Sequence, residues 1–531
     1  MSTRLRAYTM SLGVAGSLLA CSAVAASGQT TIAAGPSTSA AQPGVRAAPA
    51  MTASASPSAT AGASVLPGTV APSAFRRPAE RPNILLVTMD DASVADLAYM
   101  PRLQRLVVRQ GTSFDGVAPT PICVPARASI LTGQYAHNHG SRTIFGAHGG
   151  FRSFDDSATL PVWLRKAGYD TLFVGKYLND YGYPTGSTRY VPPGWTDWRG
   201  SLDGYTYDFS QAVLNVNGSI RSFREYQTNA FAGQIDKMLR DPRRTRKPWF
   251  MWANYVAPHH GAPIESDDPL ADGIERVPTP MPAKRDRNTF SSLPLPSTPD
   301  MFVVPRGAPA DSPSRTRWRP RLRDAVREGN QQRIESLQSV DRALAGHLRS
   351  LRRTGQLERT LVVVTSDNGF AVGQHNRYHK LWGYQDMLRI PIIMRGPTIP
   401  RGQVSETTVT NADLPVTFAR LARARIGREV DGANVLAHVR GRTQGVRVIP
   451  LEAWPVTNGR KRLWSGIRVG SWTYMRYRKG GEELFDTRSD PYQLRNLAPR
   501  PAYADQLAEM RSLKREYLEC RGTSCPQTFY R

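Results

Sequence analysis

Two pairs of oxygen-bearing side chains in the sequence could bind a divalent metal ion. Asp90 and Asp91 are adjacent, as are Asp367 and Asn368, and each pair comes after a short apolar run. Three carboxylates and one amide oxygen suit a hard cation better than zinc, so the set predicts one Ca²⁺ ion, with Mg²⁺ as the alternative. A single Asp-Asp pair is also typical of a turn or a helix cap, but the second pair favours the metal site.

Cys123 lies between two prolines in the stretch APTPICVPARASILTG, at residues 118–133. The residues from Pro125 onward predict the start of a helix, and the amide groups of a first helical turn favour an anion. A deprotonated or modified Cys123 would therefore face both the metal and the cation of Arg127. The alternative is a buried, inert thiol, which is common for free cysteine. We expect the proline and arginine neighbours to make this a poor burial site.

The segments around these residues predict an α/β fold. From Arg81 onward, β-branched apolar runs alternate with helical patterns, which favours a largely parallel sheet. Ligands bind beyond the carboxyl ends of the strands in such sheets, so the polar residues after the runs are expected to converge on one site. The runs are residues 83–88, 171–174, 249–253 and 361–365, and their polar tails are Asp90-Asp91, Gly175-Lys176, Ala257-Pro258-His259 and Ser366-Asp367-Asn368-Gly369.

Three further regions complete the predicted architecture. Apolar residues recur at spacings of three and four between Ile334 and Leu351, which predicts a long core helix that stops at Thr354-Gly355. Residues 275–320 are rich in proline and predict a surface segment that borders the pocket. After Gly445, short strands and turns predict a small antiparallel sheet with a closing helix.

The composition and charge suggest a class of partner. The chain has 531 residues and a formal net charge of +26, which favours an acidic partner such as a polyanionic glycan or a cell-surface polymer. The alternative is a solvated basic surface without a specific partner. No zinc-finger, RNA-binding or helix-turn-helix signature accompanies the charge, so we expect no nucleic-acid partner.

The first residues have the pattern of an export signal. Residues 1–26 combine a basic start, a short apolar run and a small-residue end, and the run is too short to span a bilayer. Cleavage after Ala25 and a lipoprotein box that places lipid on Cys21 are both consistent with this pattern. Residues 27–80 are Ala, Ser, Thr, Pro and Gly with few large apolar residues, which predicts a disordered linker. The protein is therefore expected to be secreted or to be a cell-surface lipoprotein.

The four cysteines divide into groups that suit an exported protein. Cys21 belongs to the signal or carries the lipid. Cys520 and Cys525 are near enough in sequence to close a small disulfide loop. Cys123 then has no partner, which makes it available for chemistry.

CVPARASILTG resembles the signature of the type I sulfatases, Cys-x-Pro-Ser-Arg followed by Leu-Thr-Gly, in which the cysteine is oxidised to formylglycine. Ala126 replaces the more frequent serine, while the cysteine, proline and arginine are kept. RPNILLVTMDD, TSDNG, APH and LFDTRSDPYQLRNLA are similar to other family motifs, in family order. The resemblance implies an alkaline-phosphatase-like large mixed sheet flanked by helices, with a catalytic domain at residues 81–445 and a smaller C-terminal antiparallel-sheet subdomain at residues 446–531.

The resemblance also implies a role for each candidate residue. Formylglycine at position 123, made by a maturation enzyme, would join the cation, and its hydrated aldehyde would be the nucleophile. The second hydroxyl of the hydrate would then expel sulfate. The metal ligands would be Asp90, Asp91, Asp367 and Asn368; Arg127 and Lys176 would stabilise the nucleophile; and Lys380 and His259 would hold the sulfate and assist the leaving alcohol.

GKYLNDYG and VPPGW are similar to the N-acetylglucosamine-6-sulfatase and heparan endosulfatase branch, which implies a 6-O-sulfated glucosamine-type substrate. Leu178 stands where many sulfatases have a histidine, and Gln385 where the family usually has a glutamate. The alternatives are a phosphonate or phosphodiester hydrolase of the same superfamily and a non-catalytic binder of sulfated glycans. Of the remaining histidines, no spacing connects His137 and His139 to the metal ligands, so a structural role is at least as consistent with the sequence as a functional one, and His375 is expected to lie at the rim of the pocket.

Overall fold

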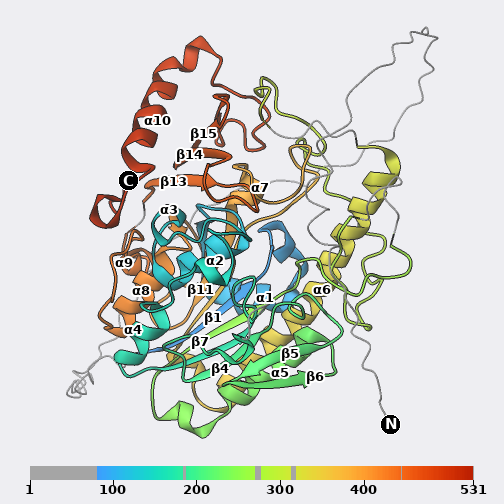
Figure 1. Ribbon diagram of the computed structural model, residues 1–531, viewed down its shortest axis with the longest axis vertical. Helices are drawn as coiled ribbons and strands as arrows, with labels where there is room; N and C mark the ends of the chain where they lie inside the picture. Colours follow the sequence, from blue (N-terminus) through green and yellow to red (C-terminus); the bar gives the residue numbers. More distant parts are fainter. Residues whose placement is uncertain (1–80, 183–186, 269–276, 313–317, 444, 530–531) are drawn as a thin grey trace, which may run out of the picture. The chain divides into compact units, whose positions relative to one another are not determined.

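A ten-stranded mixed sheet forms the centre of the computed structural model, which describes residues 81–182, 187–268, 277–312, 318–443 and 445–529 (Figure 1). The predicted signal, Cys21 and the predicted linker lie outside the described residues. The strand order is β12-β2-β11-β8-β1-β7-β3-β4-β5-β6. The strands are β1 (Asn83–Met89), β2 (Thr112–Val117), β3 (Asp170–Gly175), β4 (Asp197–Ser201), β5 (Ala212–Val216), β6 (Ser219–Phe223), β7 (Trp249–Tyr255), β8 (Thr360–Ser366), β11 (Arg389–Arg395) and β12 (Gln403–Thr410).

The middle of this sheet is parallel and its flanks contain antiparallel pairs. β8, β1, β7, β3 and β4 pair in parallel, and Leu86 of β1 lies opposite both Trp252 and Val363. β11 runs antiparallel to β8 and β2, and β5 runs antiparallel to β4 and β6. The four predicted runs correspond to the four central strands. They were visible in the sequence because a parallel strand that is buried on both faces is apolar along its whole length. The flanking antiparallel strands make the sheet mixed.

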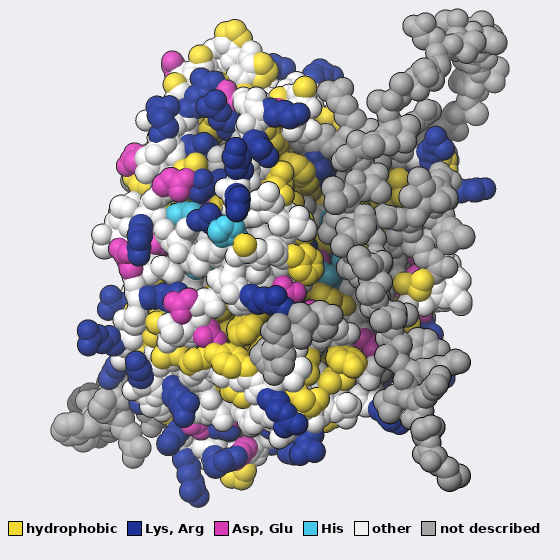
Figure 2. All heavy atoms as spheres, in the orientation of Figure 1, with side chains coloured by type: hydrophobic (Ala, Val, Ile, Leu, Met, Phe, Trp, Pro, Cys, Tyr) yellow, Lys and Arg dark blue, Asp and Glu magenta, His cyan; other side chains and the backbone are white. Residues whose placement is uncertain are grey.

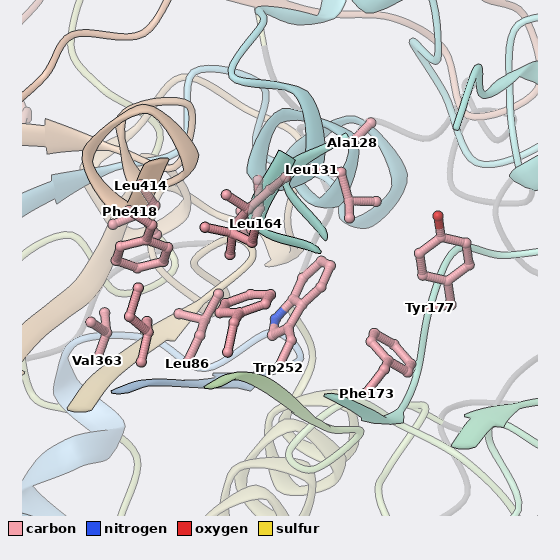
Figure 3. Packing of buried hydrophobic residues seen from close by; sticks show 14 of the residues in the cluster. Leu86, Ala128, Leu131, Leu164, Phe173, Tyr177, Trp252, Val363, Leu414 and Phe418 are labelled. Carbon is pink, nitrogen blue, oxygen red and sulfur yellow. The ribbon is translucent and has the colours of Figure 1, made fainter. Parts of the chain in front are cut away.

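Helices cover both faces of the sheet. On one face, Leu86, Trp252 and Val363 pack toward α2, α4 and α8, as Figure 3 shows. On the other face, alternate strand residues such as Leu85 and Val87 pack against α5 and α6. The helices are α1 (Pro101–Leu106), α2 (Cys123–Thr132), α3 (Ala136–His139), α4 (Leu160–Lys166), α5 (Gln227–Leu239), α6 (Pro320–Arg353), α7 (Gln385–Leu388), α8 (Asp413–Ala422), α9 (Leu436–Val439) and α10 (Ala504–Tyr517). Short 3-10 helices lie at Ala95–Tyr99, Val108–Gln110, Phe151–Ser153, Ser187–Arg189, Pro242–Thr245, Leu357–Arg359, Pro501–Tyr503 and Gly522–Ser524.

The predicted long helix is α6, and it begins earlier than its apolar spacing indicates. Its first part is rich in Arg, Glu and Gln and has few apolar residues, so the helical period there is not visible. It ends at Arg353, and Gly355 then adopts a φ of 66°, which glycine tolerates without a side-chain clash.

A separate four-stranded antiparallel sheet lies near the C-terminus, as the short strands and turns predict. Its order is β13-β14-β15-β16, and α10 packs on it through Leu507 and Met510. A disulfide joins Cys520 to Cys525, with 4.8 Å between their Cα atoms. No helix among the described residues is long and apolar enough to cross a membrane. The strands are β13 (Val448–Ala453), β14 (Trp464–Val469), β15 (Trp472–Tyr477) and β16 (Glu482–Asp486), and a further two-stranded hairpin is formed by β9 (Ala371–Val372) and β10 (Tyr378–His379).

Candidate active site

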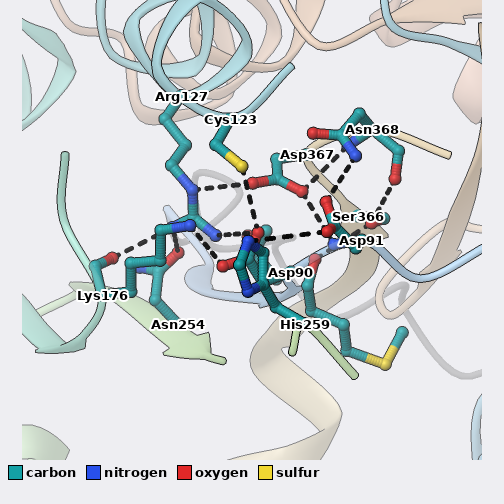
Figure 4. Close-up of polar contacts among 12 residues, drawn as sticks. Asp90, Asp91, Cys123, Arg127, Lys176, Asn254, His259, Ser366, Asp367 and Asn368 are labelled. Atoms are coloured by element: carbon teal, nitrogen blue, oxygen red, sulfur yellow. Dashed lines mark hydrogen bonds and ion pairs between the residues drawn. The ribbon is translucent and has the colours of Figure 1, made fainter. Parts of the chain in front are cut away.

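The carboxyl ends of four adjacent strands bring the predicted polar tails together. The strands β8, β1, β7 and β3 are neighbours in the sheet and end at the same edge, so the residues that follow them meet there. Helix α2 brings its first turn to the same place, and Lys380 follows β10. Figure 4 shows the resulting cluster of Asp90, Asp91, Cys123, Arg127, Lys176, His259, Asp367 and Asn368.

The oxygen-bearing side chains are fully buried and in mutual contact. Asn368 Nδ2 donates to Asp91 Oδ1 at 2.7 Å, and the backbone N–H of Asp91 donates to Asp367 Oδ1 at 3.1 Å. Asp91 Oδ2 and Asn368 Oδ1 are buried without a hydrogen-bond partner in the described part of the chain. Buried polar atoms are normally paired, and oxygen atoms of this kind are the ligands of hard cations. The donor set therefore fits one Ca²⁺ or Mg²⁺ ion.

Three cationic side chains balance the three carboxylates. Arg127 Nε donates to Asp367 Oδ2 at 2.8 Å. Lys176 pairs with Asp90, and Lys380 pairs with Asp91. Burial alone would raise the pKa of Asp90, but Lys176, His259 and Arg127 together hold it well below its usual range. Since the carboxylates and cations cancel, a bound divalent cation would make the site positive, which suits an anionic ligand.

Cys123 is the first residue of α2 and is 1% exposed. Its Sγ lies 3.4 Å from Asp90 Oδ1 and 2.9 Å from Lys380 Nζ. Burial, assisted by Asp90, raises the pKa of the thiol to about 12, so the thiol is neutral at physiological pH. The expectation that proline and arginine neighbours disfavour burial is wrong, because Arg127 is itself buried with carboxylate and carbonyl partners.

Arg127 also ties α2 to the ends of two strands. Its Nη1 donates to the carbonyl of Lys176 at 3.0 Å and to Asn254 Oδ1 at 3.1 Å. Gly175 has a φ of 108°, and a Cβ at this position would lie 1.8 Å from the carbonyl oxygen of Asn254. Glycine is therefore required for the close approach of β3 and β7 that positions Lys176. Sequence reasoning missed Asn254, although a polar residue inside the apolar run of β7 is a visible signal.

His259 presents one ring nitrogen to the site. Its Nδ1 donates to the carbonyl of His260 at 2.7 Å, which leaves Nε2 to face Asp91 Oδ2 at 3.7 Å. The ring stacks on Tyr207, with 4.5 Å between centroids. Burial lowers the pKa of His259 to about 4 despite Asp90 and Asp91, so the imidazole is neutral near pH 7.

Other site residues were missing from the sequence analysis. Lys176 Nζ lies 5.0 Å from the Tyr207 ring centroid, and the rings of His260 and His379 lie 5.9 Å apart. Tyr207 comes from the chain between β4 and β5, and no regular spacing connects it to the strand tails. His260 and His379 directly neighbour predicted site residues, and that adjacency was the one signal available.

Several histidine-related expectations have clear outcomes. His137 pairs with Glu452 and with the carbonyl of Cys520, so it links α3 to the C-terminal part of the chain. His139 lies in hydrogen-bonding distance of the hydroxyl of Ser129 and the carbonyl of Pro125. Leu178 is part of the apolar core. His375 is 1% exposed, so the expectation that it lies at the pocket rim is wrong.

Comparison with known proteins gives a consistent set of matches. The family model for sulfatases matches residues 82–424, and the model for the C-terminal region of N-sulphoglucosamine sulphohydrolase matches residues 373–519. The extracellular sulfatase SULF-1 homolog of Drosophila melanogaster is 30% identical over 399 residues, which are 71% of this chain and 32% of that protein. The N-acetylglucosamine-6-sulfatase of Homo sapiens is 30% identical over 377 residues, which are 68% of this chain and 65% of that protein. The chain thus spans less than two thirds of either relative.

A solved structure shares the fold. It is a protein in complex with its substrate D-glucosamine-2-N,6-O-disulfate, and it superposes with a TM-score of 0.68 at 20% identity. The superposition covers 82% of this chain and 97% of that chain. The large mixed sheet and the smaller C-terminal sheet therefore form one known architecture.

Proposed function

Because the chain belongs to the sulfatase family, whose model matches residues 82–424, we propose that it hydrolyses sulfate esters of sugars at the cluster around Cys123. The observation that carries the proposal is the position of Cys123 at the start of α2, between Asp90 and Lys380. A neutral thiol with a pKa of about 12 is a poor nucleophile at neutral pH. The position therefore favours an oxidised Cys123, which is formylglycine in the family that the motif resembles.

The surrounding side chains have the properties that ester hydrolysis requires. Asp90, Asp91, Asp367 and Asn368 would hold one Ca²⁺ or Mg²⁺ ion, and formylglycine beside that ion supplies a hydrated aldehyde hydroxyl as the nucleophile. The other assignments follow from charge and tautomer: Arg127 orients Asp367, Lys176 and Lys380 would bind the sulfate oxygens, and His259, whose Nε2 faces Asp91, would assist the leaving alcohol.

The proposed substrate is a 6-O-sulfated glucosamine-type sugar. Its support is the GKYLNDYG and VPPGW similarity, together with a relative named N-acetylglucosamine-6-sulfatase and a structural neighbour solved with a 6-O-sulfated glucosamine. The charge of +26 would favour encounter with a sulfated polyanion. In the face that Figure 2 shows, Lys and Arg side chains are spread widely instead of forming a single stripe. The charge therefore supports attraction to a polyanion and does not define a binding groove.

The proposed location is outside the cell, either secreted or attached by lipid at Cys21. The support is the pattern of residues 1–26 and a relative named as an extracellular sulfatase. We also propose that residues 81–445 form the catalytic domain and residues 446–531 the C-terminal subdomain. The second sheet, β13 to β16, falls inside the latter range.

The decisive test combines peptide mass with substrate turnover. Active enzyme should carry formylglycine at position 123, and Cys123→Ser should lose multiple turnover because an ester to serine has no second hydroxyl to expel sulfate. A glucosamine 6-sulfate should be turned over faster than an aryl sulfate or an aryl phosphodiester. Full activity with an unmodified thiol would refute the chemistry. Faster phosphodiester turnover would favour a phosphodiester hydrolase, and tight binding of sulfated glycan without turnover would favour a binder.

A further inference from the structure

A second group of metal-ligand side chains, two of them buried and one partly exposed, lies outside the cluster around Cys123. Asp300 comes from the proline-rich segment, His375 from the turn between β9 and β10, and Asp386 from α7. His375 Nε2 lies 3.7 Å from Asp300 Oδ2 and 3.6 Å from Asp386 Oδ2, and all three ligand atoms lie within 4.8 Å of one another. Three segments that are distant in sequence thus converge through side chains that the proposed chemistry does not use.

These side chains are not satisfied by one another. Both separations from His375 exceed hydrogen-bonding distance. Asp300 Oδ1, on the carboxylate that faces His375, is buried and has no hydrogen-bond partner within the described ranges. No Lys or Arg among the described residues forms an ion pair with Asp300 or Asp386. Asp300 is buried, and a buried carboxylate normally has a partner of this kind, so an additional cation is the group that would complete the site.

The backbone and its neighbours hold the His375 ring between the two carboxylates. The ring stacks on Tyr384, with 4.1 Å between centroids and 11° between planes. The backbone N–H of His375 donates to the carbonyl of Asp300 at 2.9 Å. His375 itself has a φ of 52°, a conformation that is costly for a residue with a Cβ and that persists where its surroundings fix it. The imidazole is therefore oriented before any ligand binds.

We propose that Asp300, His375 and Asp386 bind a second divalent metal ion, of the zinc class, at a site separate from the hard-cation ligands. Tetrahedral zinc with bonds of about 2.0–2.1 Å separates its ligand atoms by roughly 3.4 Å, close to the separations from His375. The imidazole nitrogen disfavours Ca²⁺ and suits zinc or a similar transition metal. The side chain of Asp386 is 30% exposed, so solvent can supply the fourth ligand.

The ion would link the proline-rich segment to the part of the chain that carries Lys380. Residue 301 already bridges to residue 374 in an antiparallel pair, and Lys380 directly follows β10. The expected effect of the ion is therefore to fix the β9–β10 hairpin and, through it, the position of Lys380. This role does not depend on the proposed substrate.

The test measures metal content in the full-length enzyme, with Zn²⁺ and Co²⁺ as probes. Wild-type protein should bind one zinc ion in addition to the hard cation, and Co²⁺ should give the intense visible bands of tetrahedral coordination. Asp386→Asn should weaken zinc binding at least about tenfold, and His375→Gln should abolish the cobalt bands. Since Asp386 is partly exposed, its substitution keeps the test valid even where His375→Gln does not fold.

Two matched variants separate this site from other acidic groups. Asp267→Asn removes one charge from the group formed by Glu265, Asp267 and Asp268, and it should leave zinc binding unchanged. The Asp90→Asn, Asp91→Asn double variant should lose activity and the hard cation while it retains zinc. Zinc binding equal to wild type in Asp386→Asn and His375→Gln would overturn the proposal, as would absence of zinc binding in the wild type. Failure of the sulfatase chemistry would appear separately, in the turnover of the wild-type enzyme.

Discussion

Replacing Asp367 with asparagine is expected to remove activity without a comparable loss of stability. Asp367 is completely buried, and burial together with Asp90 raises its pKa to about 6 although Arg127 lies 2.8 Å away. The ordinary pKa of an aspartate is 3.8. Raising it to about 6 therefore destabilises the folded state by about 3 kcal/mol at neutral pH. Asparagine has the same shape without the charge and removes this cost.

The contribution of Asp367 to the stability of the folded protein depends on pH. Below pH 4 the carboxyl is protonated in both the folded and unfolded states, so Asp367 has no effect on stability. Between pH 4 and about pH 6 the unfolded state ionises first, and the folded protein becomes progressively less stable; above pH 6 the loss is constant. Because this pKa already includes the attraction to Arg127, the variant should be more stable than wild type by up to about 3 kcal/mol at pH 8, and the difference should shrink as the pH falls toward 4.5.

The assay is urea unfolding from pH 4.5 to pH 8 in the presence of a chelator, because a bound cation would itself keep Asp367 ionised. Turnover with metal restored should fall at least about a hundredfold, since a ligand and the partner of Arg127 are lost together.

Asp413→Asn is the matched control: Asp413 is also buried, pairs with Arg447 and accepts two backbone N–H groups. It lies outside the cluster, so its substitution should cost about 3–5 kcal/mol with activity retained. A loss of that size for Asp367→Asn at every pH would show that Asp367 is mainly a structural cap.

Three other outcomes are expected. Iodoacetamide at pH 8 should not alkylate unmodified Cys123 in the folded protein, because the thiol is buried and its pKa is about 12; modification detected by peptide mass within minutes would contradict this. Gly175→Ala should lower the free energy of unfolding by at least about 1–3 kcal/mol and lower turnover, since a Cβ would lie 1.8 Å from the carbonyl oxygen of Asn254; an unchanged melting temperature would be inconsistent with the close strand approach. Cys520→Ser together with Cys525→Ser should cost about 2 kcal/mol for the loop that the disulfide closes, and wild-type protein should lose the same amount on reduction.

The central strands and the convergence of the polar residues that follow them were predictable because both depend on local sequence. Strands that are buried on both faces must be apolar along their whole length, so β1, β3, β7 and β8 were visible as runs. Their order in the sheet was not needed, since the carboxyl ends of parallel strands share an edge. That single rule was sufficient to predict that Asp91 and Asn368 lie close together.

What the sequence did not reveal depends on distant parts of the chain. Arg127 looked unfavourable for burial because its partners, Asp367 and the carbonyl of Lys176, come from other strands. Asp300 lies in a proline-rich segment without periodicity, so no pattern could place it beside His375. The early start of α6 was hidden for a different reason, since a mostly polar first part shows no apolar stripe.

The burial of α2 constrains the order of events during biosynthesis. Every residue of this helix is buried, and the Cys123 sulfur lies beneath the helix with Asp90 and Lys380 against it. An enzyme that oxidised this sulfur would have to reach it, and the folded protein buries it. Any conversion of Cys123 therefore has to occur while the chain is still unfolded, and molecules that fold first remain permanently unconverted. Under the proposed formylglycine chemistry, the relative rates of modification and folding would set the fraction of active enzyme, and a modifying enzyme added to folded protein would not increase it.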